Sequence, residues 1–240
     1  MKTAQWLCIG LALSPAFALG EEVLGASPRS FYLELKASPF TPQIDSGFAD
    51  PGPYKKTFGT FMWLGEAELD FQFFQRFGSL AVGLSAGYAE KYGKAFVANS
   101  GAPSTESTGL HIVPIKALLV YRFDWLNSKL GIPLVPYLKG GPVIMPWWVT
   151  KGPNIETIAG HPELRGAGYK WGLAGTVGLA FCLDFLDRRL ARDFDTSMGV
   201  NHSYLFAEGT LQNMVLFEPV NTKPLNLSSM HVNFGLGLEF

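Results

Sequence analysis

The chain has 240 residues and a formal net charge of −1, with 16% charged, 48% hydrophobic and 14% aromatic side chains. So much apolar surface excludes a disordered chain. The 19 basic and 20 acidic residues leave no basic excess to neutralise phosphates, so we expect no nucleic-acid partner. With 27 glycines, the chain is more apolar and less charged than an ordinary soluble domain.

The first 20 residues have the features of a secretory signal peptide. Lys2 precedes an almost wholly apolar stretch over residues 5–13, and small residues within 16–20 offer a cleavage site. The apolar stretch is about half the roughly 20 residues that a membrane-spanning helix needs, which makes an uncleaved anchor the weaker alternative. Cleavage would remove Lys2 and Cys8, leaving a net charge of −2 and Cys182 as a single cysteine without a disulfide partner.

Period-two alternation of apolar and polar side chains recurs along the rest of the chain. Residues 31–36 place phenylalanine and leucine on one face and tyrosine, glutamate and lysine on the other, and residues 66–73 repeat the pattern. In the last segment every even-numbered residue is apolar, and every odd-numbered one is polar or glycine. The sequence predicts eight strands, over 31–36, 66–73, 80–92, 110–125, 134–149, 169–183, 202–216 and 229–240.

The connections between these strands alternate in kind. Long segments over 41–56, 93–109, 150–168 and 217–228 alternate with the connections over 75–79, 126–133 and 184–201. After residue 20 no stretch is long and apolar enough for a transmembrane helix. An even number of alternating strands, with the long loops at one end, is typical of outer-membrane β-barrels. A soluble barrel such as a lipocalin would place its apolar side chains inside instead.

The aromatic residues favour the membrane alternative, because amphipathic rings form girdles at both headgroup layers. Rings lie near the predicted strand ends on the short-connection side (Phe71, Phe73, Phe74, Tyr121, Phe123, Trp125, Phe181, Phe185, Tyr204, Phe206, Phe240) and on the other side (Tyr88, Tyr92, Trp147, Trp148, Tyr169, Trp171, Phe217). We therefore predict an all-β fold over residues 25–240: an eight-stranded antiparallel up-and-down transmembrane barrel in the outer membrane, with both termini periplasmic.

One short periplasmic helix is expected within residues 185–196. Leu186, Leu190 and Phe194 recur every four residues, with charged residues between them that include Arg188, Arg189 and Arg192. Such a helix either packs against the rim of the barrel or lies in the interface, where its arginines meet lipid phosphates.

The last eight residues resemble the C-terminal assembly signal of Gram-negative outer-membrane proteins, matching it at Asn233, Gly235, Leu238 and Phe240. The resemblance implies that the barrel-assembly machinery is a partner during insertion. More loosely, residues 31–40, 134–141 and 202–208 resemble the myxobacterial-type outer-membrane β-barrel family, a likeness that implies the same fold and no activity.

The alternation directs a set of charged residues into the lumen: Glu34, Lys36, Glu66, Glu68, Asp70, Lys116, Arg122, Glu208 and Glu239. An eight-stranded barrel is just wide enough for side chains to fill it. Unpaired charges there would cost several kcal/mol each, so these residues form either a plug of ion pairs or an ion-conducting network. Several glycines share the inward parity, where a narrow lumen leaves little room: Gly83, Gly87, Gly172, Gly178, Gly235 and Gly237.

No catalytic signature is found. His202 and Ser203 are adjacent on a strand and point to opposite faces, and the chain has neither a lipase-type Gly-x-Ser-x-Gly nor a phosphate-binding loop. The four histidines lack zinc-site spacing. We expect no catalytic residue, cofactor or metal, and outer-membrane lipids as partners. The leading hypothesis is a structural or surface-interaction barrel, with a narrow channel and a lipid-modifying enzyme as alternatives.

Overall fold

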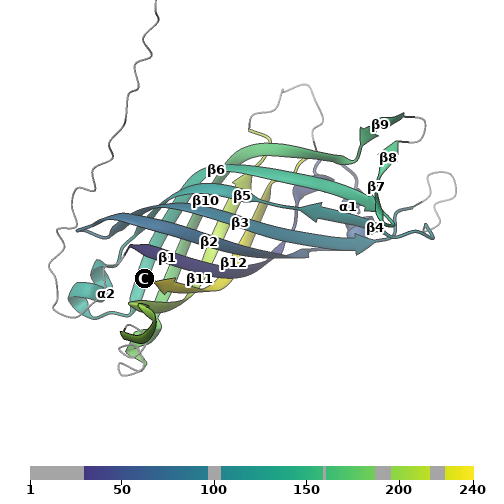
Figure 1. The fold of residues 1–240 in the computed structure, drawn as a ribbon. Helices are drawn as coiled ribbons and strands as arrows, with labels where there is room; N and C mark the ends of the chain where they lie inside the picture. Colours follow the sequence, from purple (N-terminus) through teal and green to yellow (C-terminus); the bar gives the residue numbers. More distant parts are fainter. Residues whose placement is uncertain (1–29, 97–103, 159–160, 187–195, 217–224) are drawn as a thin grey trace, which may run out of the picture.

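The computed structural model describes residues 30–96, 104–158, 161–186, 196–216 and 225–240. The predicted signal peptide over residues 1–20 lies outside them. The described residues form a closed ring of antiparallel strands (Figure 1). The strands of the ring are β1 (Phe31–Phe40), β2 (Met62–Gln75), β3 (Ser79–Gly93), β4 (Thr108–Ile112), β5 (Ile115–Arg122), β6 (Leu134–Lys151), β10 (Ala167–Cys182), β11 (His202–Asn213) and β12 (Ser229–Glu239).

Each strand pairs with its neighbours in the chain, and β12 pairs with β1 to close the ring. The segments β4 and β5 together occupy one place between β3 and β6. Ile112 pairs with Trp147 and Ile115 with Ile144, so the register continues across the break. Pro114 interrupts the ladder because it has no backbone N–H to donate. The prediction of an eight-stranded up-and-down barrel is therefore confirmed.

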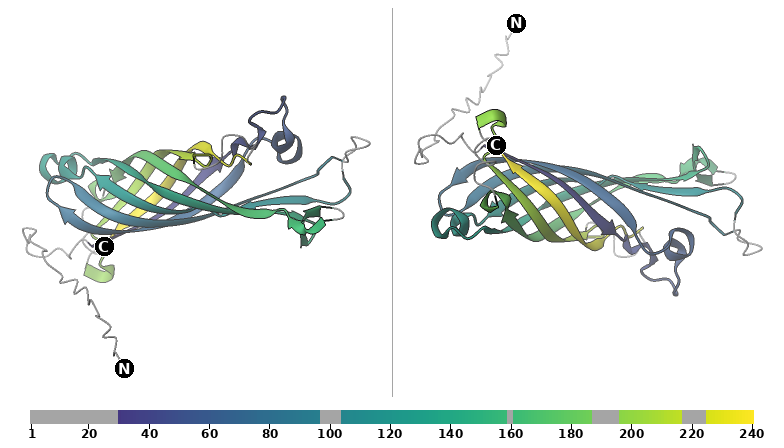
Figure 2. Two further views of the ribbon diagram at one scale, coloured as in Figure 1. Left: turned by 90° about the horizontal axis from the view of Figure 1, so that it is seen from above. Right: turned by 90° about the horizontal axis from the view of Figure 1, so that it is seen from below.

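The shorter elements lie at the two ends of the barrel. Ser30 and Phe240 meet at the terminal end, where the N–H of Ser30 donates to the Phe240 carbonyl over 2.7 Å. The helices α2 (Trp125–Leu130) and η2 (Leu183–Phe185) also lie there (Figure 1). The opposite, loop end carries η1 (Gln43–Asp45), α1 (Pro53–Phe58), β7 (Asn154–Ile155), β8 (Thr157–Ile158) and β9 (His161–Arg165). At this loop end, β3 and β6 extend past the ends of β11 and β12 (Figure 2).

Some local predictions were wrong or fall outside the described residues. Trp125 begins α2 rather than ending a strand, and the long loops contain short elements that were not expected. Most of the expected helix over 185–196, including Arg188, Arg189 and Arg192, lies outside the described residues. No helix in the described part of the chain is long and apolar enough to cross a membrane.

The two faces of the barrel wall differ in polarity. Exposed apolar side chains lie on the outer face of the strands around the ring, among them Leu35, Leu84, Leu138 and Leu205. Many of the predicted girdle rings, such as Phe71 and Trp171, are exposed on this outer face. Trp147 instead packs against a buried apolar cluster, and Phe217 lies outside the described residues. Tyr204 and Phe206 are also exceptions, since both are buried in the lumen with Tyr32 and Tyr137. Their even-numbered positions on β11 share the inward parity of Glu208, so assigning them to a girdle was wrong.

Candidate functional site: the filled lumen

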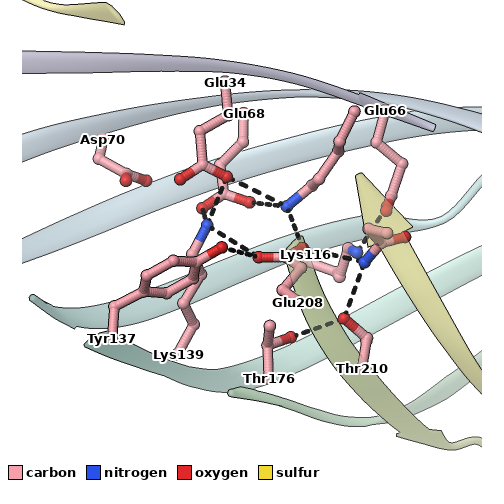
Figure 3. Close-up of polar contacts among 12 residues, drawn as sticks. Glu34, Glu66, Glu68, Asp70, Lys116, Tyr137, Lys139, Thr176, Glu208 and Thr210 are labelled. Atoms are coloured by element: carbon pink, nitrogen blue, oxygen red, sulfur yellow. Dashed lines mark hydrogen bonds and ion pairs between the residues drawn. The ribbon is translucent and has the colours of Figure 1, made fainter. Parts of the chain in front are cut away.

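The lumen contains a network of buried charges. All nine charged residues that the sequence directs inward are buried there. A tenth, Lys139 on β6, is also buried and lies at the centre of the network (Figure 3). The alternation along 134–149 could have predicted that Lys139 points inward. Lys139 is the single charged residue of that segment, and it is two residues from Tyr137, which lies on the inward face.

Lys139 reaches across the lumen from the wall opposite β1. Its Nζ lies 2.5 Å from Glu34 Oε2 on β1, 2.7 Å from Glu68 Oε1 on β2 and 3.5 Å from Glu208 Oε2 on β11. One ammonium group therefore joins three strands on other parts of the ring to β6. The ammonium group donates hydrogen bonds to Glu34 and Glu68, which use two of its three N–H donors.

Lys36 joins the same three glutamates from β1. Its Nζ lies 2.6 Å from Glu68 Oε2, 3.0 Å from Glu208 Oε1 and 3.4 Å from Glu34 Oε2. Lys36 and Lys139 thus bind different oxygens of Glu68 and of Glu208. Burying a charge is expensive unless it is paired and hydrogen-bonded, and this arrangement satisfies both conditions.

Two more cations serve the remaining acids of β2. Arg122 binds Asp70 and also lies 2.9 Å from Glu34 Oε1. Its guanidinium carbon sits 3.8 Å from the centroid of the Tyr32 ring, in cation–π geometry. On the loop-end side, Lys116 Nζ lies 2.5 Å from Glu66 Oε1. Each of the three acids of β2 therefore has at least one cation beside it.

Neutral donors complete the network. Glu208 accepts hydrogen bonds from Tyr137 Oη at 3.0 Å and from Asn233 Nδ2 at 2.9 Å. Glu239, nearest the terminal end, accepts from Gln72 Nε2 at 2.9 Å and Tyr204 Oη at 3.3 Å. Both of these donors are neutral, whereas the other lumen acids bind lysine or arginine.

Apolar clusters lie beside the charged residues of the lumen. Toward the terminal end, Tyr32, Tyr137, Tyr204 and Phe206 form a buried cluster with smaller neighbours. On the loop side a larger buried cluster crosses the lumen: Phe40, Tyr54, Met62, Leu64, Ala89, Leu110, Ile112, Val143, Met145, Ala174, Met214 and Leu227. The larger cluster lies on the loop side of the charges, whereas the tyrosine-rich cluster is level with part of them, since Tyr32 pairs with Asp70 on β2 and Glu239 on β12.

The first long connection folds over the loop end and supplies Tyr54 to the apolar layer. Asp45 of η1 fixes this lid: its Oδ1 accepts the Tyr54 N–H at 2.7 Å and its Oδ2 accepts the Lys55 N–H at 3.0 Å, at the start of α1. Burial and the nearby Asp45 raise the pKa of Tyr54 to about 12, so its phenol stays neutral. Pro53 stands where a helix needs no N–H donor.

Inward glycines make room for the large lumen residues. A Cβ on Gly178 would lie 2.3 Å from the Tyr137 ring, and one on Gly237 would lie 2.1 Å from Tyr32 Oη. A Cβ on Gly83 would fall 2.1 Å from Asp70 Oδ1. At these three positions there is therefore little room for a side chain larger than that of glycine.

The residues of the C-terminal motif occupy two sides of β12. Asn233 is fully buried and donates to Glu208 and Thr210, and Gly235 lies against Phe206. Phe240 continues the pairing of β12 with β1, because its N–H donates to the Phe31 carbonyl over 2.8 Å. The motif therefore has contacts in the folded barrel besides any part in assembly, which stays a prediction.

At the terminal rim, Asp184 contacts both His202 and Ser203, the adjacent residues that begin β11. His202 Nδ1 lies 2.5 Å from Asp184 Oδ2, and the Ser203 hydroxyl donates to Asp184 Oδ1 over 3.3 Å. Burial opposes ionisation of this carboxyl, but the hydrogen bonds from His202 and Ser203 lower the pKa of Asp184 overall. Sequence reasoning missed Asp184 because it lies outside any alternating segment.

A closed eight-stranded ring with an apolar outer wall and buried charges inside defines the class: the chain is a β-barrel protein of the outer membrane. It is similar to the outer membrane protein OprG of Pseudomonas aeruginosa, with 11% identity, coverage of 90% of this chain and 98% of that one, and a TM-score of 0.50. That likeness concerns the fold alone.

Two further solved structures cover nearly the whole barrel. The attachment invasion locus protein Ail of Yersinia pestis is 12% identical, with 88% of this chain and 97% of that chain covered and a TM-score of 0.43. The N-terminal barrel domain of Pseudomonas aeruginosa OprF is 12% identical, with 89% and 100% covered and a TM-score of 0.42. The sequence matches no protein-family model and no curated protein.

Proposed function

We propose that this barrel is a non-conducting structural protein of the outer membrane that presents its loop end at the cell surface. The observation that supports this role is the packing of side chains across the lumen. Ions crossing the barrel would have to pass the apolar cluster around Phe40 and Met145, the interlocked Lys36 and Lys139, and the tyrosine-rich cluster. A permeant pathway requires polar groups that an ion can enter and leave, whereas these charges already bind one another.

A cluster of stacked rings toward the loop end supports the second half of the proposal. On the outer face of the β3–β4–β6 wall, the buried His111 ring stacks on Trp148, with centroids 5.1 Å apart, and meets Tyr92 edge-on at 5.6 Å. Tyr88 Oη lies 2.8 Å from His111 Nδ1. An ordered wall of this kind holds the loop end in a fixed shape, which suits contact with a partner.

Single-channel recording in planar bilayers tests the closed lumen. We expect the purified, folded chain to insert without defined conductance steps, while a general porin inserted under the same conditions gives them. A gel-mobility difference between boiled and unboiled samples establishes that the barrel is folded. Regular steps from the folded wild type would replace this proposal with the narrow channel.

Labelling of intact cells tests the orientation. A cysteine introduced at Asn154 in β7, in a Cys182→Ser background, should react with a membrane-impermeant maleimide. A cysteine at Asn127 in α2 should react after the envelope is opened and not before. The reverse pattern contradicts surface presentation of the loop end. Lipids extracted from the same cells should be unaltered in mass, since a modified lipid would favour the enzyme alternative.

A further inference from the structure

Three metal-ligating side chains converge at the terminal end of the lumen. Cys182 is the last residue of β10, Asp184 lies two residues later in η2, and His202 begins β11. One ligand atom from each lies within 4.8 Å of the other two. The closeness follows from the barrel register: Cys182 pairs with Tyr204, so His202 lies one inward position nearer the rim.

The carboxylate of this group is held in a fixed orientation. Its Oδ1 accepts both the backbone N–H of Ser203, at 3.2 Å, and the Ser203 hydroxyl, at 3.3 Å. Its Oδ2 is left facing His202 Nδ1 at 2.5 Å. Outer partners of this kind orient metal-binding carboxylates in proteins.

We propose that Cys182, Asp184 and His202 form a Zn²⁺ site at the periplasmic mouth of the barrel. Sulfur, nitrogen and oxygen ligands suit a borderline ion such as Zn²⁺, and three protein ligands leave a fourth position for water. On binding, the thiol proton of Cys182 goes to solvent, and the ion takes the place of the proton between His202 Nδ1 and Asp184. An imidazolium releases that proton to solvent, whereas a neutral ring carries its one proton on Nε2 when Nδ1 binds the ion. Affinity therefore falls as the pH is lowered.

Burial favours an ion over a larger ligand at this position. Cys182 is only 3% exposed, which leaves its thiol no room to attack a substrate. The side chains of Asp184 and His202 are 18% and 24% exposed, so an ion can approach from the rim. Within the described part of the chain, a second group with ligand atoms close together is Glu34, Glu68 and Asp70. Lysine and arginine side chains already bind these carboxylates.

Cobalt is the probe for the test, because a thiolate bound to Co²⁺ gives a near-ultraviolet charge-transfer band. The folded full chain in detergent, kept reduced, should develop this band at one Co²⁺ per chain and lose it when Zn²⁺ is added. Cys182→Ser and His202→Gln should abolish the band. The matched control His111→Gln should keep it, since it removes an imidazole elsewhere in the barrel.

Ser203→Ala tests the orientation of the carboxylate without removing a ligand. We expect Zn²⁺ affinity, measured by competition with a chromophoric chelator, to fall by roughly 10- to 100-fold. The boiled and unboiled gel pattern must be unchanged for each variant that is compared, and Ser203→Ala decides the matter if a ligand variant does not fold. Absence of the band in the folded wild type, a band that survives Cys182→Ser, or unchanged affinity in Ser203→Ala would overturn the site.

Discussion

Lys139 on β6 and Glu34 on β1 stand on opposite walls of the barrel, and yet their Nζ and Oε2 atoms are 2.5 Å apart. An ion pair across the full width of the ring couples strands that share no backbone hydrogen bonds. Lys36 binds Glu34 and Glu68, the same two glutamates as Lys139, so the ion pairs in the lumen connect opposite sides of the barrel wall.

Replacement of Lys139 by methionine should strongly destabilise the barrel. The change keeps an unbranched side chain that is one atom shorter, but it leaves the carboxylates of Glu34 and Glu68 with less positive charge beside them. Breaking a buried ion pair in this way costs about 3–5 kcal/mol. Urea unfolding in detergent, followed by the unboiled gel band, measures the loss. The control Lys129→Met, on exposed α2, should stay within about 0.5 kcal/mol of wild type.

A second change separates charge from packing. If the defect of Lys139→Met comes from an uncompensated carboxylate, adding Glu34→Gln should restore part of the lost stability. A double variant that is as unstable as the two separate losses added together would mean that the two residues are not coupled.

The acids of the lumen should differ in importance according to their partners. Glu68 is bound by two lysines, at 2.6 and 2.7 Å, whereas Glu239 accepts from a neutral amide and a phenol. Glu68→Gln should therefore lower the urea midpoint more than Glu239→Gln, because it leaves two ammonium groups short of a counter-charge. Equal midpoints for the two variants would count against a structural role for the network.

The alternation of the sequence was enough to predict the ring and the wall. A period of two assigns each residue to the lumen or the lipid independently of its neighbours across the barrel, so Glu66, Glu68 and Asp70 could be placed without a structure. The same rule, applied evenly, would have placed Lys139, Tyr204 and Phe206. The pairing of Lys139 with Glu34 could not be predicted, because it depends on the stagger of strands that are not adjacent in the ring.

The lid and the rim depend on contacts that have no periodic signal. The helix α1 has six residues, too few to show a helical repeat, and its start is fixed by Asp45 from a different element. Asp184 likewise follows the last strand residue and meets His202 after the intervening connection. Such contacts come from the folding of loops back onto the barrel, which local sequence does not encode.

Two glycines of β10 provide a matched pair for testing the filling of the lumen. A Cβ on the inward Gly178 would lie 2.3 Å from the Tyr137 ring, while a Cβ on the outward Gly175 meets nothing within 4 Å. Gly178→Ala should destabilise the folded barrel by about 1–3 kcal/mol through overpacking. Gly175→Ala should not destabilise it, since an alanine there meets lipid. The urea midpoints of the two variants make the comparison, and a tolerated Gly178→Ala would mean that Tyr137 has space to move.

Acid should weaken the rim through Asp184. Burial raises the pKa of this carboxyl, but the hydrogen bonds from His202 and Ser203 lower the pKa by more than burial raises it. The pKa of Asp184 in the folded chain therefore lies below the value of about 3.9 for an unfolded chain. A lowered folded pKa contributes stability above the unfolded pKa, and this contribution is lost as the pH falls toward the folded value. The difference in urea midpoint between wild type and Asp184→Asn should therefore be large at pH 6 and shrink toward pH 3. A constant difference would contradict the assignment.

The lid over the loop end should open when its cap is removed. Asp45→Ala takes away the acceptors of the Tyr54 and Lys55 N–H groups, and the loss of a helix cap costs about 0.5–2 kcal/mol. Because 1.4 kcal/mol is about a tenfold change in an equilibrium, trypsin should cut after Lys55 or Lys56 several times faster in the folded variant. Asp50→Ala removes only an exposed ion pair with Lys55 and should leave the rate nearly unchanged. Mass spectrometry of the fragments identifies the cut, and equal rates in the two variants would show that Asp45 does not hold the lid closed.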